Sequence, residues 1–302
     1  MSPGTQGHLA MLAFSALVAG SFSLGSMMAN DIAPTAFTAA RFGLASVFVG
    51  VLAWQRGGLA ARNFDAPWRY AVLGGLFGLY FVLMFEGLRT APPISAAAVF
   101  TLVPLMAAGF AYVILRQIVT PRMALALAIG GVGALWVIFR GDLGAVLAFD
   151  VGRGEAIYFI GCISHAIYTP MVRRLNKGES AVTSTFGTVF AGAILLGIYA
   201  WPDIMATDWS ALPTMVWITL FYTAFFATAV TVILLQFAAL RLPSAKVMAY
   251  TYLTPSWVIV WEVALGNAPP AVLVLGGVGL TILALALLLR DDAVAVVVPD
   301  RT

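Results

Sequence analysis

The chain has 302 residues, of which 62% are hydrophobic and only 10% are charged, and its mean hydropathy is +0.98. Soluble domains contain roughly 45–50% apolar and 25% charged residues, so this chain has too little polar surface to coat a water-soluble core. A soluble globule is therefore excluded, and a net charge of +3 does not indicate a nucleic-acid partner.

Ten apolar runs are each long enough for a helix to cross a bilayer core of ~30 Å, which takes about 20 residues. They lack the polar residue at every second position that marks the strands of a membrane barrel. The first run is too long for a cleavable signal, and no Lys or Arg precedes it. The sequence therefore predicts an all-α integral membrane protein. Its expected spans are Leu9–Met28, Pro34–Trp54, Trp68–Leu88, Pro93–Leu115, Pro121–Phe139, Gly154–Val172, Ala181–Ala200, Pro213–Gln236, Pro243–Leu265 and Ala268–Leu289.

Basic residues concentrate in alternate loops. If the amino terminus is cytoplasmic, only three basic residues lie in outside segments: Arg89, Arg140 and Arg153. All other Lys and Arg residues outside the spans or at their very ends lie in cytoplasmic segments. These are Arg56, Arg62, Arg69, Arg116, Arg122, Arg173, Arg174, Lys177, Arg241, Arg290 and Arg301. The positive-inside rule then predicts that both termini are cytoplasmic, with residues 291–302 as a cytoplasmic tail.

The sequence repeats itself at matched helix positions. Three pairs of segments correspond in order and in spacing: Gly130–Gly133 with Gly276–Gly279, Leu88-Arg89 with Leu240-Arg241, and Leu102–Pro104 with Leu253–Pro255. We expect two halves, residues 1–140 and 150–290, with five helices each. Because five is odd, the halves enter the membrane from opposite sides. Inverted repeats of this kind are typical of secondary transporters, with a substrate cavity near the midplane.

Two prolines, Pro104 and Pro255, fall near the middle of their spans. A proline removes the backbone donor to the carbonyl four residues earlier and kinks the helix, which leaves the carbonyls of Phe100 and Thr251 without that bond. A kink can serve packing alone. Breaks at equivalent positions of both halves, however, are also the sequence signature of a transporter binding site.

These features resemble the EamA-type, ten-helix branch of the drug/metabolite transporter superfamily, and within it the YddG-type amino-acid exporters. The resemblance covers nearly the whole chain and rests on Ala40-Arg41-Phe42, Ile94–Ala98, Ser244–Lys246 and Tyr168–Arg174 as well as the repeated motifs. It implies a multi-pass protein of the bacterial inner membrane that exports amino acids, including aromatic ones.

The chain departs from that family at one place. Family members often carry a glutamate near the end of the fourth and ninth helices, where this chain has Arg116-Gln117 and Gly266-Asn267. A role for that glutamate does not carry over. Glu262 lies one turn too early to replace it.

Ionisable residues inside spans are costly and are candidates for function. His165 could bind a carboxylate or relay a proton, or could be a hydrogen-bonded structural residue. Glu86 and Glu262 could carry protons or play structural roles near the interface. Arg41 could join helices or attract a substrate carboxylate. Lys246 is expected to snorkel to the cytoplasmic side.

Aromatic residues inside the spans could line a cavity or pack helices together. Tyr250, Thr254, Trp257 and Trp261 share one helical face around Pro255. The residues predicted to bind substrate are those near the two kinks and on the third and sixth spans: Tyr80, Phe100, Thr101, His165, Tyr168, Tyr250, Thr251, Tyr252 and Trp257.

The leading hypothesis is a secondary exporter of small amphipathic metabolites that works by alternating access, with the lipid bilayer and an amino-acid substrate as partners. Multidrug or other metabolite export and a non-transporting scaffold are the alternatives. A doubly negative cargo would need several cations, and only Arg41 and Lys246 are available.

Enzymatic chemistry is not expected. The sequence lacks HExxH, paired membrane aspartates and a P-loop, and Cys162 is its single cysteine, so we expect no cofactor and no metal. Facilitated diffusion is expected over proton coupling. The oligomeric state stays open, and a monomer is compatible with the sequence.

Overall fold

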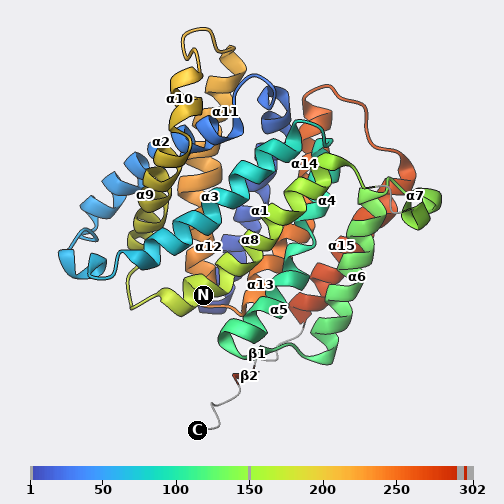
Figure 1. The fold of residues 1–302 in the computed structure, drawn as a ribbon. Coiled ribbons are helices and arrows are strands. Elements are labelled where there is room, and N and C mark those ends of the chain that lie inside the picture. Colours follow the sequence, from blue (N-terminus) through green and yellow to red (C-terminus); the bar gives the residue numbers. More distant parts are fainter. Residues whose placement is uncertain (1–2, 149–150, 291–295, 298–302) are drawn as a thin grey trace.

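The computed structural model describes residues 3–148, 151–290 and 296–297. In it the chain folds into a bundle of helices (Figure 1). Pro34, Pro93 and Pro121 each begin a helix, where a missing backbone donor costs nothing. The uninterrupted long helices are α1 (Pro3–Met28), α2 (Pro34–Gln55), α3 (Trp68–Leu88), α6 (Pro121–Ile138), α8 (Arg153–Leu175), α9 (Ala181–Tyr199) and α15 (Val272–Arg290).

Three further spans are interrupted. The first consists of α4 (Pro93–Phe100) and α5 (Val103–Leu115); the second of α11 (Thr214–Ala224), a π-helical segment (Phe225–Val230) and α12 (Thr231–Ala239); the third of α13 (Ser244–Ala249), a 3-10 turn (Tyr250–Leu253) and α14 (Thr254–Ala264). Short elements complete the described chain: a 3-10 turn (Ala61–Phe64), α7 (Leu143–Ala148), α10 (Trp201–Ala206), β1 (Gln117–Ile118) and β2 (Val296–Val297).

Helix boundaries lie close to the predicted ones, and an all-α integral membrane protein is confirmed. Eight helices of the described chain are long and apolar enough to cross a membrane. The other two predicted spans are α8, which is more polar, and the interrupted segment from α13 to α14. The largest differences are at α1, which begins at Pro3, and at α15, which begins at Val272 because Pro269-Pro270 cannot continue a helix.

Both mid-membrane breaks lie just before the prolines. Pro104 and Pro255 each occupy the first turn of the helix that follows the break. At each break a threonine hydroxyl donates to a carbonyl of the preceding turn, from Thr101 to Ala98 at 2.6 Å and from Thr251 to Met248 at 2.8 Å. The two breaks therefore have the same local chemistry in the two halves of the chain.

Equivalent helices of the two halves run antiparallel. At the crossing of α6 and α15, a Cβ atom on Gly133 would lie 2.7 Å from the Gly277 carbonyl, and one on Gly277 would lie 2.7 Å from the Gly133 carbonyl. The repeated glycine motif is thus a close backbone contact between the halves. Likewise α4 packs on α14 and α5 on α13, so the two broken spans also face each other in opposite directions. The repeat is inverted.

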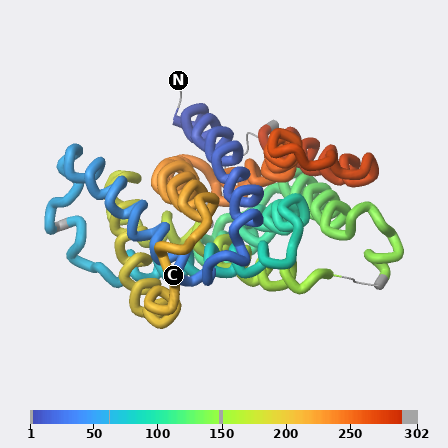
Figure 2. The backbone as a smooth tube through the Cα atoms, turned by 90° about the horizontal axis from the view of Figure 1, so that it is seen from above, coloured from blue at the N-terminus to red at the C-terminus, as the bar shows by residue number. Residues whose placement is uncertain are grey.

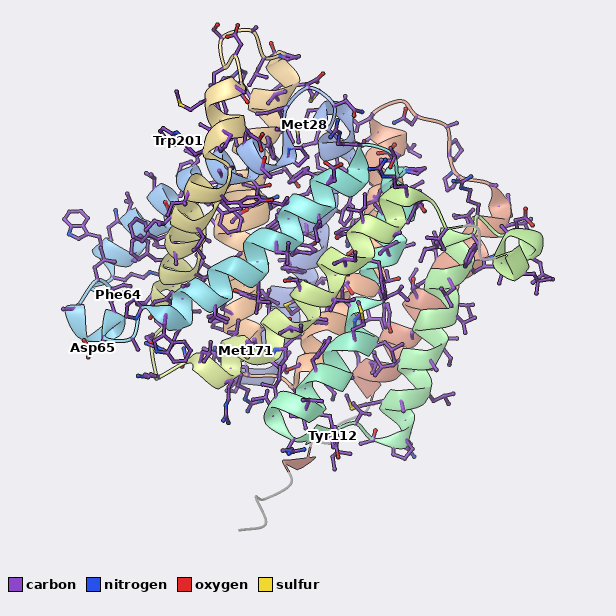
Figure 3. All side chains as sticks on the ribbon, viewed as in Figure 1. Met28, Phe64, Asp65, Tyr112, Met171 and Trp201 are labelled. Carbon is purple, nitrogen blue, oxygen red and sulfur yellow. The ribbon has the colours of Figure 1, made fainter. Side chains whose placement is uncertain are left out.

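The helices form an elongated bundle. Helices α2 and α9 lie at one side, α6 and α15 at the other, and α1, α3 and α8 lie between them (Figures 1 and 2). We call the end that holds residues 29–33 the Asp31 end, and the end that holds residues 116–120 the Arg116 end. Figure 3 labels Met28 and Trp201 at the Asp31 end, and Met171 and Tyr112 toward the Arg116 end.

The basic loops predicted to be cytoplasmic gather at the Arg116 end, because successive spans alternate in direction. Of the predicted tail, only Val296 and Val297 lie within the described residues, and they pair antiparallel with Ile118 and Gln117. The remaining residues of the tail, 291–295 and 298–302, lie outside the described residues.

Candidate substrate site

Six side chains from three helices form a stacked group in the middle of the bundle, which we call the central aromatic cluster. It consists of Phe77 and Tyr80 of α3, Phe100 of α4, and Tyr158, His165 and Tyr168 of α8. Each is at most 2% exposed. The ring centroids of Tyr80 and His165 lie 4.4 Å apart, and those of Phe77 and Tyr168 lie 4.7 Å apart. The cluster is closed to solvent in this conformation.

Hydroxyl groups give the cluster polar character at two points. The hydroxyls of Tyr80 and Tyr158 are hydrogen bonded at 2.9 Å. The hydroxyl of Tyr168 accepts a bond of 3.0 Å from the Gln236 side-chain amide of α12, which also donates to Thr188 of α9 at 3.3 Å. Helices from both halves therefore contribute polar groups at the cluster.

His165 makes no hydrogen bond with any residue that the structure describes, through either ring nitrogen. Its imidazole is held only by stacking, and it is 1% exposed. Buried polar groups are nearly always hydrogen bonded, so each exception requires an explanation. Polar groups inside an apolar, aromatic setting are what orient a small molecule in a binding site.

The other predicted aromatic residues do not join the cluster. Tyr250 is hydrogen bonded to Nδ1 of His8 at 3.1 Å, and Trp257 donates to Ser15 at 3.2 Å, so both pack against α1. The Tyr252 hydroxyl donates to the Leu127 carbonyl of α6 at 3.4 Å. Of the nine residues predicted to bind substrate, the structure brings together Tyr80, Phe100, His165 and Tyr168.

The predicted charged residues have different surroundings. Glu86 forms an exposed ion pair of 3.2 Å with Arg89. Glu262 is buried and accepts a bond of 2.9 Å from the side chain of Asn267 in the following loop. Arg41 is fully buried, and its guanidinium carbon lies 3.6 Å from the centre of the Phe81 ring. Only Arg41 of these three lies deep in the bundle.

A polar hollow of about 490 Å³ opens at the Asp31 end between α2 and α3. The Thr35 hydroxyl donates to the carboxylate of Asp203 at its rim. The polar side chains that line it are Asn30, Asp31, Thr35, Glu86, Arg89 and Asp203. This mixture of both charges at a hollow can admit a zwitterion.

At the Arg116 end, a buried ion pair joins the start of α3 to the loop after α8. Arg69 lies 2.6 Å from Glu179, both side chains are 4% exposed, and Arg69 also donates to the Leu175 carbonyl at 2.6 Å. Burial by itself raises the pKa of the Glu179 carboxyl, but the hydrogen bonds from Arg69 and from the Lys177 amide lower the pKa below its ordinary value.

We expect this pair to make the protein acid-sensitive. Since the pKa of Glu179 is lower in the folded state, its stabilisation is complete above the ordinary carboxyl value of 4.5 and is lost as the pH falls below it. At neutral pH, Glu179→Gln leaves the Arg69 charge buried and should lower the free energy of unfolding by roughly 3 kcal/mol. Thermal unfolding in detergent at several pH values measures both effects.

A matched control is Glu86→Gln, which removes an ion pair whose side chains are 45% and 35% exposed. Its effect on stability should stay within about 1 kcal/mol. Equal losses in the two variants would contradict the assigned role of the Arg69–Glu179 pair.

Two members of the central aromatic cluster, Phe77 and Tyr158, were not predicted from the sequence, and neither were Gln236 and the ion pair of Arg69 with Glu179. Phe77 lies one turn before Tyr80 on α3. Tyr158 is spaced so that it shares one face of α8 with His165, and helical periodicity could have identified it. Gln236 and the pair of Arg69 with Glu179 acquire their roles only through contacts between distant segments. Nothing in local spacing marks these contacts.

Comparisons with known proteins agree with this architecture. The model of the EamA-like transporter family matches two segments, residues 5–139 and 152–290. A Bacillus subtilis (strain 168) protein described as the uncharacterized transporter YyaM is 26% identical over 274 residues, which cover 90% of each chain. A crystal structure described only as that of a protein shares the fold, with a TM-score of 0.70 at 19% identity over 95% of this chain and 96% of the other.

Proposed function

The chain belongs to the EamA-like transporter family, and from this premise we propose that it is a secondary transporter that exports small amphipathic metabolites, in the first place amino acids with aromatic side chains. The observation that carries the proposal is the central aromatic cluster, one member of which, the His165 imidazole, has no hydrogen-bond partner among the described residues. Aromatic rings suit a planar apolar side chain, and polar groups suit the charged ends of an amino acid.

The proposed orientation decides which end of the protein meets which side of the membrane. With the basic Arg116 end in the cytoplasm, the polar hollow at the Asp31 end faces outward and the buried ion pair of Arg69 with Glu179 lies on the inner side. In the proposed cycle the two halves, residues 1–140 and 150–290, move relative to each other around the central aromatic cluster and expose it alternately to the two sides.

Facilitated diffusion is the proposed mode. Glu86 is engaged with Arg89 and Glu262 with Asn267, so neither carboxylate stands alone in the bundle. Transport should then follow the substrate gradient. A pH gradient alone should not drive accumulation of substrate.

The test is transport by purified protein in lipid vesicles, with phenylalanine, tyrosine, tryptophan, leucine, ethidium and a sugar as solutes. Aromatic amino acids should exchange fastest. Transport of ethidium without amino acids would instead support multidrug export, and no protein-dependent transport of any solute would support a scaffold. Accumulation driven by an imposed pH gradient would contradict facilitated diffusion.

A matched pair of variants assigns the site. Tyr168→Phe removes the hydroxyl that pairs with Gln236 and should change the ratio of tyrosine to leucine transport by about fivefold, the equivalent of roughly one hydrogen bond. Tyr252→Phe removes a hydroxyl outside the cluster and should leave the ratio unchanged. Initial rates in the vesicle assay give both ratios. The same shift in both variants would contradict the placement of the site.

A further inference from the structure

Arg41 carries a buried positive charge without a counterion. It is 0% exposed, and its Nε donates to the Thr228 hydroxyl at 2.6 Å while one terminal nitrogen, Nη2, donates to the Ala227 carbonyl at 2.8 Å. Phe81 covers one face of the guanidinium. Within the described ranges, Nη1 has no hydrogen-bond partner and no carboxylate forms an ion pair with Arg41. Unpaired charge at this depth is costly to retain.

The helix opposite Arg41 is distorted in a way that holds the guanidinium. In a regular α-helix the amide of Thr231 would bond to the carbonyl of Ala227. In the π-helical segment it bonds instead to the carbonyls of Phe226 and Thr228, and the Ala227 carbonyl accepts from Arg41. Helix α3, the equivalent in the other half, has no such segment along its described length. Single π-helical turns often occur at functional sites.

Arg41 lies between the polar hollow at the Asp31 end and the central aromatic cluster. Thr35 of α2 and Glu86 of α3 line the hollow, and Arg41 follows Thr35 by about 9 Å along the helix at 1.5 Å per residue. Phe81, which covers Arg41, lies 4.7 Å from the ring of Tyr80 in the cluster. The guanidinium therefore neighbours both the hollow and the cluster through α2 and Phe81.

We propose that Nη1 of Arg41 binds the carboxylate of the transported molecule. This inference rests on the proposed function and specifies its substrate class as a monoanionic carboxylate, because one guanidinium offers one site for one carboxylate. The Thr228 hydroxyl and the Ala227 carbonyl hold the guanidinium in place. The apolar part of the molecule then lies against the central aromatic cluster.

The test measures binding to purified protein in lipid nanodiscs with three probes of similar size. L-Tryptophan carries both charges, indole-3-propionate lacks the ammonium group, and tryptamine lacks the carboxylate. Arg41→Gln should weaken binding of both carboxylates by roughly 30-fold, because the charged partner is removed in a buried setting. Tryptamine binding should stay the same or become tighter. Arg41→Lys keeps a cation and should retain part of the preference for carboxylates.

The control is Arg241→Gln, since Arg241 also lies over a ring, that of Phe237 at 3.5 Å, but is exposed. It should leave all three affinities unchanged. Three results would overturn the inference. Arg41→Gln could weaken all three probes equally, carboxylate binding could be independent of Arg41, or the unmodified protein could bind no carboxylate. Carboxylates that bind through Arg41 but never cross the vesicle membrane would overturn only the proposed function.

Discussion

Replacing His165 with leucine is expected to make the protein more stable and its transport at least tenfold slower. The imidazole has no hydrogen bond within the described chain, so its removal ends a penalty of about 1–3 kcal/mol for a buried unpaired polar group. The loss of ring stacking destabilises the variant by about 0.5–1.5 kcal/mol and so offsets part of this gain. We therefore expect the free energy of unfolding to rise by about 1 kcal/mol. Thermal unfolding measures the stability, and tryptophan transport in vesicles measures the rate.

The second histidine of the chain is the matched control. His8 of α1 is hydrogen bonded to Tyr250, so His8→Leu removes an existing bond and should lower stability while transport per folded molecule is retained. Opposite signs of the two stability changes are the essential result. A destabilised His165→Leu protein with normal transport would show that the imidazole is structural and lies outside the site.

Replacing Gly154 with leucine is expected to prevent assembly of the bundle. A Cβ atom at this position would meet the carbonyl of Gly87 in the last turn of α3 and would lie 2.6 Å from the amide nitrogen of Ala91 in the loop that follows. The contact is mutual, since a Cβ atom on Gly87 would lie 2.7 Å from the Gly154 carbonyl. Backbone cannot yield as a flexible side chain does, so the cost should exceed the roughly 1–3 kcal/mol of ordinary overpacking.

This glycine contact also positions the candidate site, because α3 and α8 carry five of the six residues of the central aromatic cluster. Size-exclusion chromatography of the detergent extract should show little monodisperse Gly154→Leu protein. In Gly279→Leu, the new Cβ has no described atom within 4 Å apart from the adjoining backbone of its own helix, and this variant should behave like the unmodified chain. A well-folded Gly154→Leu protein would contradict the close approach of α3 and α8.

Membrane class, helix positions and the paired halves were predictable from the sequence, because each depends on local composition and order. A span needs only length and apolarity, as Trp68–Leu88 shows, and its predicted bounds agree with those of α3. The glycine motif predicted the relation between the halves, and its physical basis proved to be the contact of Gly133 with Gly277.

The composition of the candidate site was decided by the tertiary structure. In lipid, side chains around a helix are apolar on every side, so sequence periodicity does not distinguish the face that points to a cavity from the face that packs on a neighbour. Tyr250 and Trp257 were predicted beside His165, yet their helix turns them toward α1. The π-helical segment opposite Arg41 has no local sequence signal either. It forms where the carbonyl of Ala227 accepts from a residue of α2, far away in the chain.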